Sequence, residues 1–144
     1  MEPLTFTVDK FTFRIAADRG YTVGGLWVLA DGDRLRMGVS DFVQGHSGDV
    51  TFVEMRPAGT ALERGEPLGQ LETIKVTLEL LSPATGRIVA VNPRLETAAE
   101  IVNEDPYGEG WLLELDATAW PGERDDLLSP EAYCDLARAQ AEEH

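Results

Sequence analysis

Residues 68–91, with the sequence LGQLETIKVTLELLSPATGRIVAV, constrain the fold more than any other part of the chain. Two apolar segments flank the tetrapeptide ETIK at residues 72–75, and a third apolar segment follows the turn SPATG at residues 82–86. Short apolar segments that are separated by turn residues predict antiparallel β-strands with tight connections. The first of these connections would present Lys75 to solvent at the tip of a hairpin.

The use of lysine in this chain draws further attention to that tip. The sequence contains two lysines, Lys10 and Lys75, against ten arginines. An ammonium group can lose its proton and be acylated, whereas a guanidinium group stays protonated and is a poor target. We therefore interpret Lys75 as the attachment point of a covalent prosthetic group. A solvated hairpin lysine without a chemical role is the alternative that the turn alone leaves open.

The remaining patterns predict a mainly β fold. Ser40 is placed to cap a short helix near residues 40–46, and Ser129 followed by Pro130 is placed to begin a C-terminal helix. Apolar segments predict further strands at residues 4–15 (a hairpin broken at Asp9 and Lys10), 26–30, 35–39, 49–55, 86–91 and 111–115. We expect connecting loops at residues 61–67, 103–110 and 119–126. Such a chain favours a sandwich or flattened barrel with a terminal helix.

Composition and charge exclude several classes of function. The net charge is −14, and residues 61–144 hold 18 acidic residues against 6 basic ones. Nucleic acids and anionic membranes require basic patches, so we expect neither as a partner. The acidity fits docking on basic surfaces of larger proteins, although acidity also simply keeps a protein soluble. Cys134 is the only cysteine, no segment is long and apolar enough to span a membrane, and the N-terminus lacks a targeting pattern, so we expect a cytoplasmic protein.

The other polar and aromatic residues form no pattern typical of an active site. His46 and His144 are the only histidines, and neither belongs to an acid–serine–histidine arrangement. The acids of NEDPYGEG, residues 103–110, lack the spacing of a calcium-binding EF-hand, and we interpret this segment as a structural loop. The aromatic residues are most simply interpreted as core residues: Trp27, Phe42, Phe52 and Trp111.

Four blocks of the chain resemble the H protein of the glycine cleavage system, a family of lipoyl carriers. They are residues 38–50 (GVSDFVQ followed by GDV), residues 52–59 (FVE with Pro57 and Gly59), residues 72–86 (ETIK with Ser82-Pro83 and Gly86) and residues 102–111 (VNEDPYGEGW). An isolated E-x-x-K would be a weak signal, but the order and spacing of all four blocks are specific. The resemblance covers residues 21–133.

The resemblance implies a fold and a site. The fold would be a barrel-sandwich hybrid, lipoyl-domain-like, of two small antiparallel sheets with the two helices described above. Residues 21–144 would form the carrier domain, with residues 1–20 as an extended segment packed on it. Lys75 would carry lipoic acid as N6-lipoyllysine, and the chain would be a carrier without catalytic residues or metal ligands. Ile74 and Val76 flank Lys75 where biotin carriers have methionines, which favours lipoate over biotin.

The resemblance also implies partners. The lipoyl group would accept an aminomethyl group from glycine decarboxylase and pass it to an aminomethyltransferase, and dihydrolipoamide dehydrogenase would reoxidise it. A lipoate ligase or a lipoyl/octanoyl transferase would attach the cofactor. Glu72, three residues before Lys75, is a plausible recognition element for these enzymes, or an ordinary turn acid. We expect the carrier to be a monomer.

The chain departs from the family pattern in three places, of which the first is the most informative. Family members usually have His-Glu before the tryptophan that corresponds to Trp27, whereas this chain has Gly25-Leu26. The first dozen residues look like an extension, and the connector at residues 120–126, WPGERDD, is more acidic and longer than usual. These differences keep two alternatives open. The chain could be an H-like lipoate-binding protein that serves heterodisulfide-reductase-like enzymes of sulfur oxidation, or an H-like interaction module that carries no cofactor.

Overall fold

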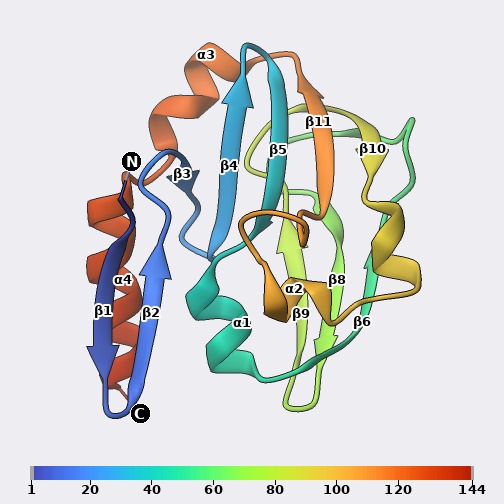
Figure 1. Ribbon diagram of the computed structural model, residues 1–144. Coiled ribbons are helices and arrows are strands. Elements are labelled where there is room, and N and C mark those ends of the chain that lie inside the picture. The colour runs from blue at the N-terminus through green and yellow to red at the C-terminus, as the bar shows by residue number, and fades with distance from the viewer. Residues whose placement is uncertain (1, 144) are drawn as a thin grey trace.

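The computed structural model describes residues 2–143 and contains three antiparallel sheets with short helices at their edges (Figure 1). The largest sheet has the order β3-β4-β5-β11-β10-β7, so strands from both halves of the chain lie side by side. Its strands are β3 (Gly20–Tyr21), β4 (Leu26–Asp31), β5 (Arg34–Val39), β11 (Leu113–Ala117), β10 (Gly86–Val91) and β7 (Ala61–Leu62).

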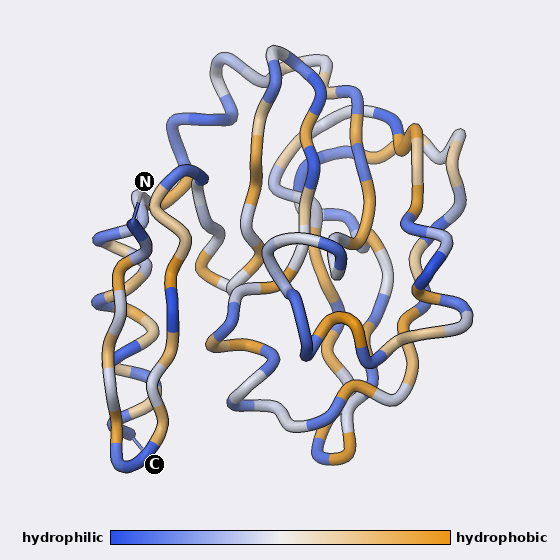
Figure 2. The backbone as a smooth tube through the Cα atoms, viewed as in Figure 1, coloured by the Kyte–Doolittle hydropathy of each residue, from blue (hydrophilic) through white to orange (hydrophobic). Residues whose placement is uncertain are grey.

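A second sheet packs against the largest one and forms the main core with it. It has the order β6 (Val50–Met55), β8 (Pro67–Thr73) and β9 (Thr77–Leu81). Side chains of both sheets share one apolar cluster, in which Leu35, Leu71 and Leu115 are fully buried. Figure 2 shows the corresponding alternation of hydrophobic and hydrophilic positions along the strands. This arrangement confirms the predicted mainly β sandwich of small antiparallel sheets.

The two predicted helices are present and begin at the predicted caps. In α1 (Asp41–Ser47), the Ser40 Oγ accepts a hydrogen bond from the Val43 N–H at 3.2 Å. In α4 (Pro130–Glu142), the Ser129 Oγ accepts one from the Ala132 N–H at 3.1 Å. Shorter helical segments are η1 (Pro93–Glu96), α2 (Ile101–Glu104), α3 (Trp120–Glu123) and η2 (Arg124–Asp126). Within residues 2–143, no helix is long and apolar enough to cross a membrane.

The loop predictions at three segments are wrong in part, because regular structure extends into each of them. Residues 61–67 contain β7 and the first residue of β8, and residues 103–110 begin inside α2. Residues 119–126 fold as α3 and η2. Trp120 explains the last difference, since its side chain is only 3% exposed and packs into the main core. One buried aromatic residue anchors a connector whose last four residues are charged.

The prediction that the four aromatic residues are core holds for two of them. Trp27 and Phe42 are buried, but Phe52 is 46% exposed, so its assignment to the core is wrong. The pairing register explains this position, because Phe52 lies opposite Glu72 on the outer face of the small sheet. Trp111 is half-buried under the Arg36 guanidinium, whose central carbon lies 4.4 Å from the ring centroid.

The N-terminal segment forms a hairpin that builds a second core. Strands β1 (Leu4–Val8) and β2 (Phe11–Ile15) pair with each other and pack on α4, as Figure 1 shows at the left of the molecule. Phe6 and Phe13 contact Phe42 of α1, with ring centroids 6.1 and 5.3 Å from the Phe42 centroid. The predicted hairpin at residues 4–15 is therefore confirmed. The division of the chain into residues 1–20 and 21–144 stays a prediction.

Candidate functional site

Lys75 lies in the turn between β8 and β9 and is exposed to solvent. The Thr73 side chain holds this turn together, because its Oγ1 accepts hydrogen bonds from the N–H groups of Lys75 (3.2 Å) and Val76 (3.0 Å). The same hydroxyl donates to the Val76 carbonyl at 3.1 Å, and the Thr73 N–H donates to that carbonyl at 2.8 Å. The backbone of the tip is thus fixed, while the Lys75 side chain is exposed to solvent.

Replacing Thr73 with valine is expected to loosen this turn without disturbing the core. Thr73→Val keeps the shape of the side chain and removes three hydrogen bonds around the tip. Exchange of the Lys75 and Val76 amide hydrogens, followed by NMR, should become at least several-fold faster. Thr77→Val is the matched control, because Thr77 is an exposed threonine on β9 and lies outside the Thr73 hydrogen-bond set. Unchanged exchange in Thr73→Val would show that the strands alone fix the tip.

Gly48 lets the segment after α1 approach the tip closely. Its φ angle is +92°, a conformation that side chains disfavour. A Cβ atom on Gly48 would lie 3.0 Å from Ile74 Cγ1 and 3.7 Å from Lys75 Cε. The Ile74 N–H also donates to the Asp49 carbonyl at 3.1 Å. The connection between α1 and β6 therefore packs against the tip and is hydrogen-bonded to it.

Gly48→Ala is expected to destabilise the protein and also to displace the tip. Both effects follow from one Cβ atom, which strains the backbone by about 1–3 kcal/mol and crowds Ile74. Gly59→Ala is the control, because Gly59 has a φ angle of +96° but nothing within 4 Å of its Cβ position. Urea unfolding should detect a loss of stability in both variants, whereas the amide resonances of Ile74 and Lys75 should shift only in Gly48→Ala. Shifts of equal size in both variants would contradict the contact at the tip.

Exposed apolar side chains lie on both sides of Lys75 in sequence and on the neighbouring sheet face. Ile74 is 67% exposed, and Val76 and Phe52 are 45% and 46% exposed. Phe52 pairs with Glu72, which in turn pairs with Thr77, so these side chains share the outer face of the small sheet. Exposed apolar side chains next to a reactive group are typical of a protein–protein contact surface. The site can therefore present an amine to the active site of another protein.

The other candidate residues have structural surroundings. The Asp105 carboxylate accepts a hydrogen bond from the Glu109 N–H at 2.9 Å, and Glu109 pairs with Arg94 at 3.1 Å, which agrees with a structural loop. Cys134 is buried, and this burial raises the pKa of its thiol. Within residues 2–143, no three His, Cys, Asp or Glu side chains are grouped so that they could hold a metal ion. His46 stacks on Phe42, and His144 lies outside the described residues.

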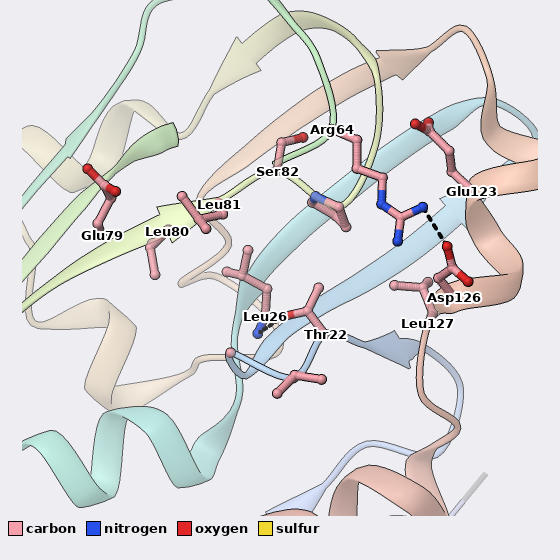
Figure 3. A pocket seen from close by; sticks show the side chains of 13 residues that line it. Thr22, Leu26, Arg64, Glu79, Leu80, Leu81, Ser82, Glu123, Asp126 and Leu127 are labelled. Carbon is pink, nitrogen blue, oxygen red and sulfur yellow. Dashed lines mark hydrogen bonds and ion pairs between the residues drawn. The ribbon is translucent and has the colours of Figure 1, made fainter. Parts of the chain in front are cut away.

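A pocket that the sequence did not predict lies at the end of β9 that is far from Lys75. Its volume is about 350 Å³, and Figure 3 shows residues from β9, from the segment before β4 and from the connector around it. An Arg64–Asp126 ion pair crosses one side of the pocket. Glu123 accepts hydrogen bonds from the N–H and the Oγ1 of Thr85, both at 2.8 Å. The acidic composition of residues 120–126 was the available signal, but it does not reveal these contacts.

The structure explains why Gly25 and Leu26 stand before Trp27. Gly25 has a φ angle of +93°, and a Cβ atom there would collide with the Val43 side chain. Leu26 is 2% exposed and lines the pocket of Figure 3. Gly25 therefore lets the backbone pack closely against α1. Leu26 contributes an apolar side chain to the wall of the pocket.

Comparisons with known proteins agree with this arrangement. Residues 19–140 match the family model described as Glycine cleavage H-protein. The chain is 44% identical over 119 residues to the glycine cleavage system H protein of Rubrobacter xylanophilus, covering 83% of this chain and 91% of that protein. It is 39% identical over 127 residues to a protein of the same name from Thermus thermophilus, covering 88% and 98% of the two chains.

A solved structure shares the fold as well. The crystal structure of a glycine cleavage system H protein from Mycobacterium marinum is similar to this chain with a TM-score of 0.75 and 31% sequence identity. The similarity covers 84% of this chain and 97% of that one. The hairpin of β1 and β2 lies before residue 19, outside the family match. From residue 19 onward, the sequence match and the shared fold make this chain a member of the glycine cleavage H-protein family.

Proposed function

We propose that Lys75 carries the lipoyl group, as N6-lipoyllysine, in a carrier protein of glycine cleavage. Members of this family are lipoyl carriers and not enzymes. The observation that carries the assignment to Lys75 is its position: an exposed amine at the fixed tip of a hairpin, inside the matched residues 19–140. Lys10, the other lysine, lies outside that match.

The residues around the tip suit this role. The hydrogen bonds of Thr73 hold the backbone of the turn, so only the lysine side chain and its attached group need to move. The Lys75 amine is available to form an amide with lipoic acid, because the residue is exposed to solvent. When attached, the dithiolane would supply a disulfide of which one sulfur can take an aminomethyl group while the other becomes a thiol. Ile74 and Val76 offer apolar contacts to whichever enzyme holds the tip.

The partners we propose are those of glycine cleavage. Glycine decarboxylase would load the carrier, an aminomethyltransferase would unload it, and dihydrolipoamide dehydrogenase would reoxidise it. A lipoate ligase or a lipoyl/octanoyl transferase would attach the cofactor. The net charge of −14 supports docking on basic surfaces of these enzymes. The names of the relatives favour glycine cleavage over the sulfur-oxidation alternative.

Mass spectrometry tests the assignment of the cofactor to Lys75. The chain is co-expressed with a lipoate ligase under lipoate-replete conditions, and its intact mass and its peptide map are measured. We expect one lipoyl amide per chain, located on the peptide that contains Lys75. A lipoyl group on Lys10, or a chain that stays unmodified while a relative's carrier is modified in the same cells, would overturn the assignment.

A further inference from the structure

A groove on the described surface runs along the free edge of β6. Its volume is about 720 Å³. One wall is β6 itself, and the opposite wall is formed by η1 and the residues that follow it. The apolar lining includes Val53, Met55, Pro93 and Leu95. The groove therefore places a lining of mixed polar and apolar side chains next to the edge of a sheet.

The edge of β6 presents backbone groups to this groove. Strand β6 pairs only with β8 in its sheet, and the Arg56 N–H donates to the Leu68 carbonyl at 2.8 Å. Backbone groups of an antiparallel strand alternate in direction, so Phe52 and Glu54 also bond toward β8. The N–H and C=O groups of Val53 and Met55 then point to the opposite side, where an added strand could bond them.

At one end of this edge, a side chain already bonds the backbone of β6. The Asn103 Oδ1 accepts a hydrogen bond from the Val50 N–H at 2.7 Å. The Asn103 amide group also donates to Gln44 at 2.9 Å and to the Gly48 carbonyl at 3.2 Å, so its position is fixed. Beyond this point, residues 2–143 provide no comparable partner for the backbone of Val53 or Met55. The open part of the edge therefore lies within the groove.

The charges of the groove select the kind of segment that it can accept. Glu54, Glu96 and Glu100 line it, and no lysine or arginine of the described chain does. The neighbouring Arg94 is already paired with Glu109. A second copy of this chain is a poor occupant, because two antiparallel β6 edges would bring Glu54 of each copy close together. Carboxylates along an open strand edge favour a segment that carries lysine or arginine.

We propose that this groove docks an extended, basic segment of a partner protein, which adds to β6 as a further strand. Val50 pairs with Thr73, so the groove starts close to the Lys75 tip and a partner docked there can reach it. The backbone of β6 provides affinity, and the three carboxylates provide selectivity. The inference rests on the proposed function for the partner's task, but the strand addition itself does not depend on the lipoyl group.

A peptide titration followed by NMR tests the proposal. The probe is a blocked heptapeptide of alternating lysine and valine, added to the full chain labelled with ¹⁵N. Binding should slow the exchange of the Val53 and Met55 amide hydrogens by tenfold or more. A peptide of the same charge with N-methylated alternate backbone positions should lose this protection. Protection that persists with the methylated peptide, or binding without protection at Val53 and Met55, would overturn strand addition.

Matched charge variants test the role of the carboxylates. The triple variant E54Q/E96Q/E100Q should bind the peptide roughly tenfold more weakly, since each exposed charge pair contributes about 0.2–1 kcal/mol. The control D135N/E142Q/E143Q removes the same charge from exposed positions of α4 and its C-cap and should bind nearly as the original chain does. Equal affinities for the two triple variants would overturn the charge argument. Concentration-dependent protection of Val53 without peptide would instead assign the groove to a second copy.

The groove test and the cofactor test can fail separately. The variant Lys75→Arg cannot be lipoylated, but it keeps β6 and the groove unchanged. We expect it to bind the peptide as the original chain does. If the original chain binds the peptide but is not lipoylated, only the assignment of Lys75 is overturned. If the original chain is lipoylated but does not bind the peptide, only the docking groove is overturned.

Discussion

Lys75→Arg is expected to abolish carrier activity while leaving the fold intact. In a system reconstituted from glycine decarboxylase, aminomethyltransferase and dihydrolipoamide dehydrogenase, glycine-dependent release of carbon dioxide should fall to the level without carrier. The reason is chemical, because the guanidinium keeps the positive charge but does not form the amide with lipoic acid. Stability should change by no more than about 0.5 kcal/mol in urea unfolding, since Lys75 is exposed at the tip of a turn.

Lys10→Arg is the matched control for this experiment. Lys10 also lies in the turn of a hairpin, between β1 and β2, and it is exposed. The substitution removes the same functional group at an equivalent kind of position, so it should leave both lipoylation and activity unchanged. If Lys10→Arg lost activity and Lys75→Arg retained it, the lipoyl group would be attached to Lys10 and not to Lys75.

Phe6→Ala is expected to destabilise the protein by about 3 kcal/mol or more. The Phe6 side chain is 3% exposed, and its ring centroid lies 5.2 Å from that of Phe13. The Arg138 guanidinium of α4 lies over the same ring, at 5.7 Å from its centroid. Removing the ring leaves a cavity between the hairpin, α1 and α4. Urea unfolding should show this loss as one cooperative transition at lower denaturant concentration.

Phe11→Ala provides the control on the same hairpin. The Phe11 side chain is 66% exposed, so its removal should change the free energy of unfolding by about 0.5 kcal/mol or less. Both residues precede the matched residues 19–140, and the comparison therefore asks whether this added hairpin belongs to the cooperative core. A loss of stability of similar size in both variants, or a separate unfolding step in Phe6→Ala, would show that the hairpin does not belong to the cooperative core.

The sequence predicts best where the determinants are local. The Lys75 tip follows from a turn between two apolar segments, and the caps at Ser40 and Ser129 follow from residues within one helical turn of them. Each of these features depends on neighbours that are close along the chain. Local patterns were therefore sufficient for the position of the turn that holds Lys75 and for both predicted helices.

Features that depend on distant contacts were not predictable in the same way. The exposure of Phe52 depends on its register against Glu72, which alternation within one strand does not specify. The burial of Trp120 draws the connector into α3, and Glu123 then bonds Thr85 of another loop. Gly25 is required because Val43 of α1 occupies the space of its Cβ atom. Each of these residues meets partners that are remote in sequence.

The exchange of carbon dioxide between glycine and bicarbonate tests the central claim most directly. Glycine decarboxylase catalyses this exchange when it can load a lipoylated carrier, so the assay requires only these two proteins. The lipoylated chain is compared with the lipoylated H protein of Thermus thermophilus, to which it is 39% identical. We predict exchange with both carriers and none with Lys75→Arg. Exchange with the Thermus carrier alone, although Lys75 is fully lipoylated, would contradict a role in glycine cleavage.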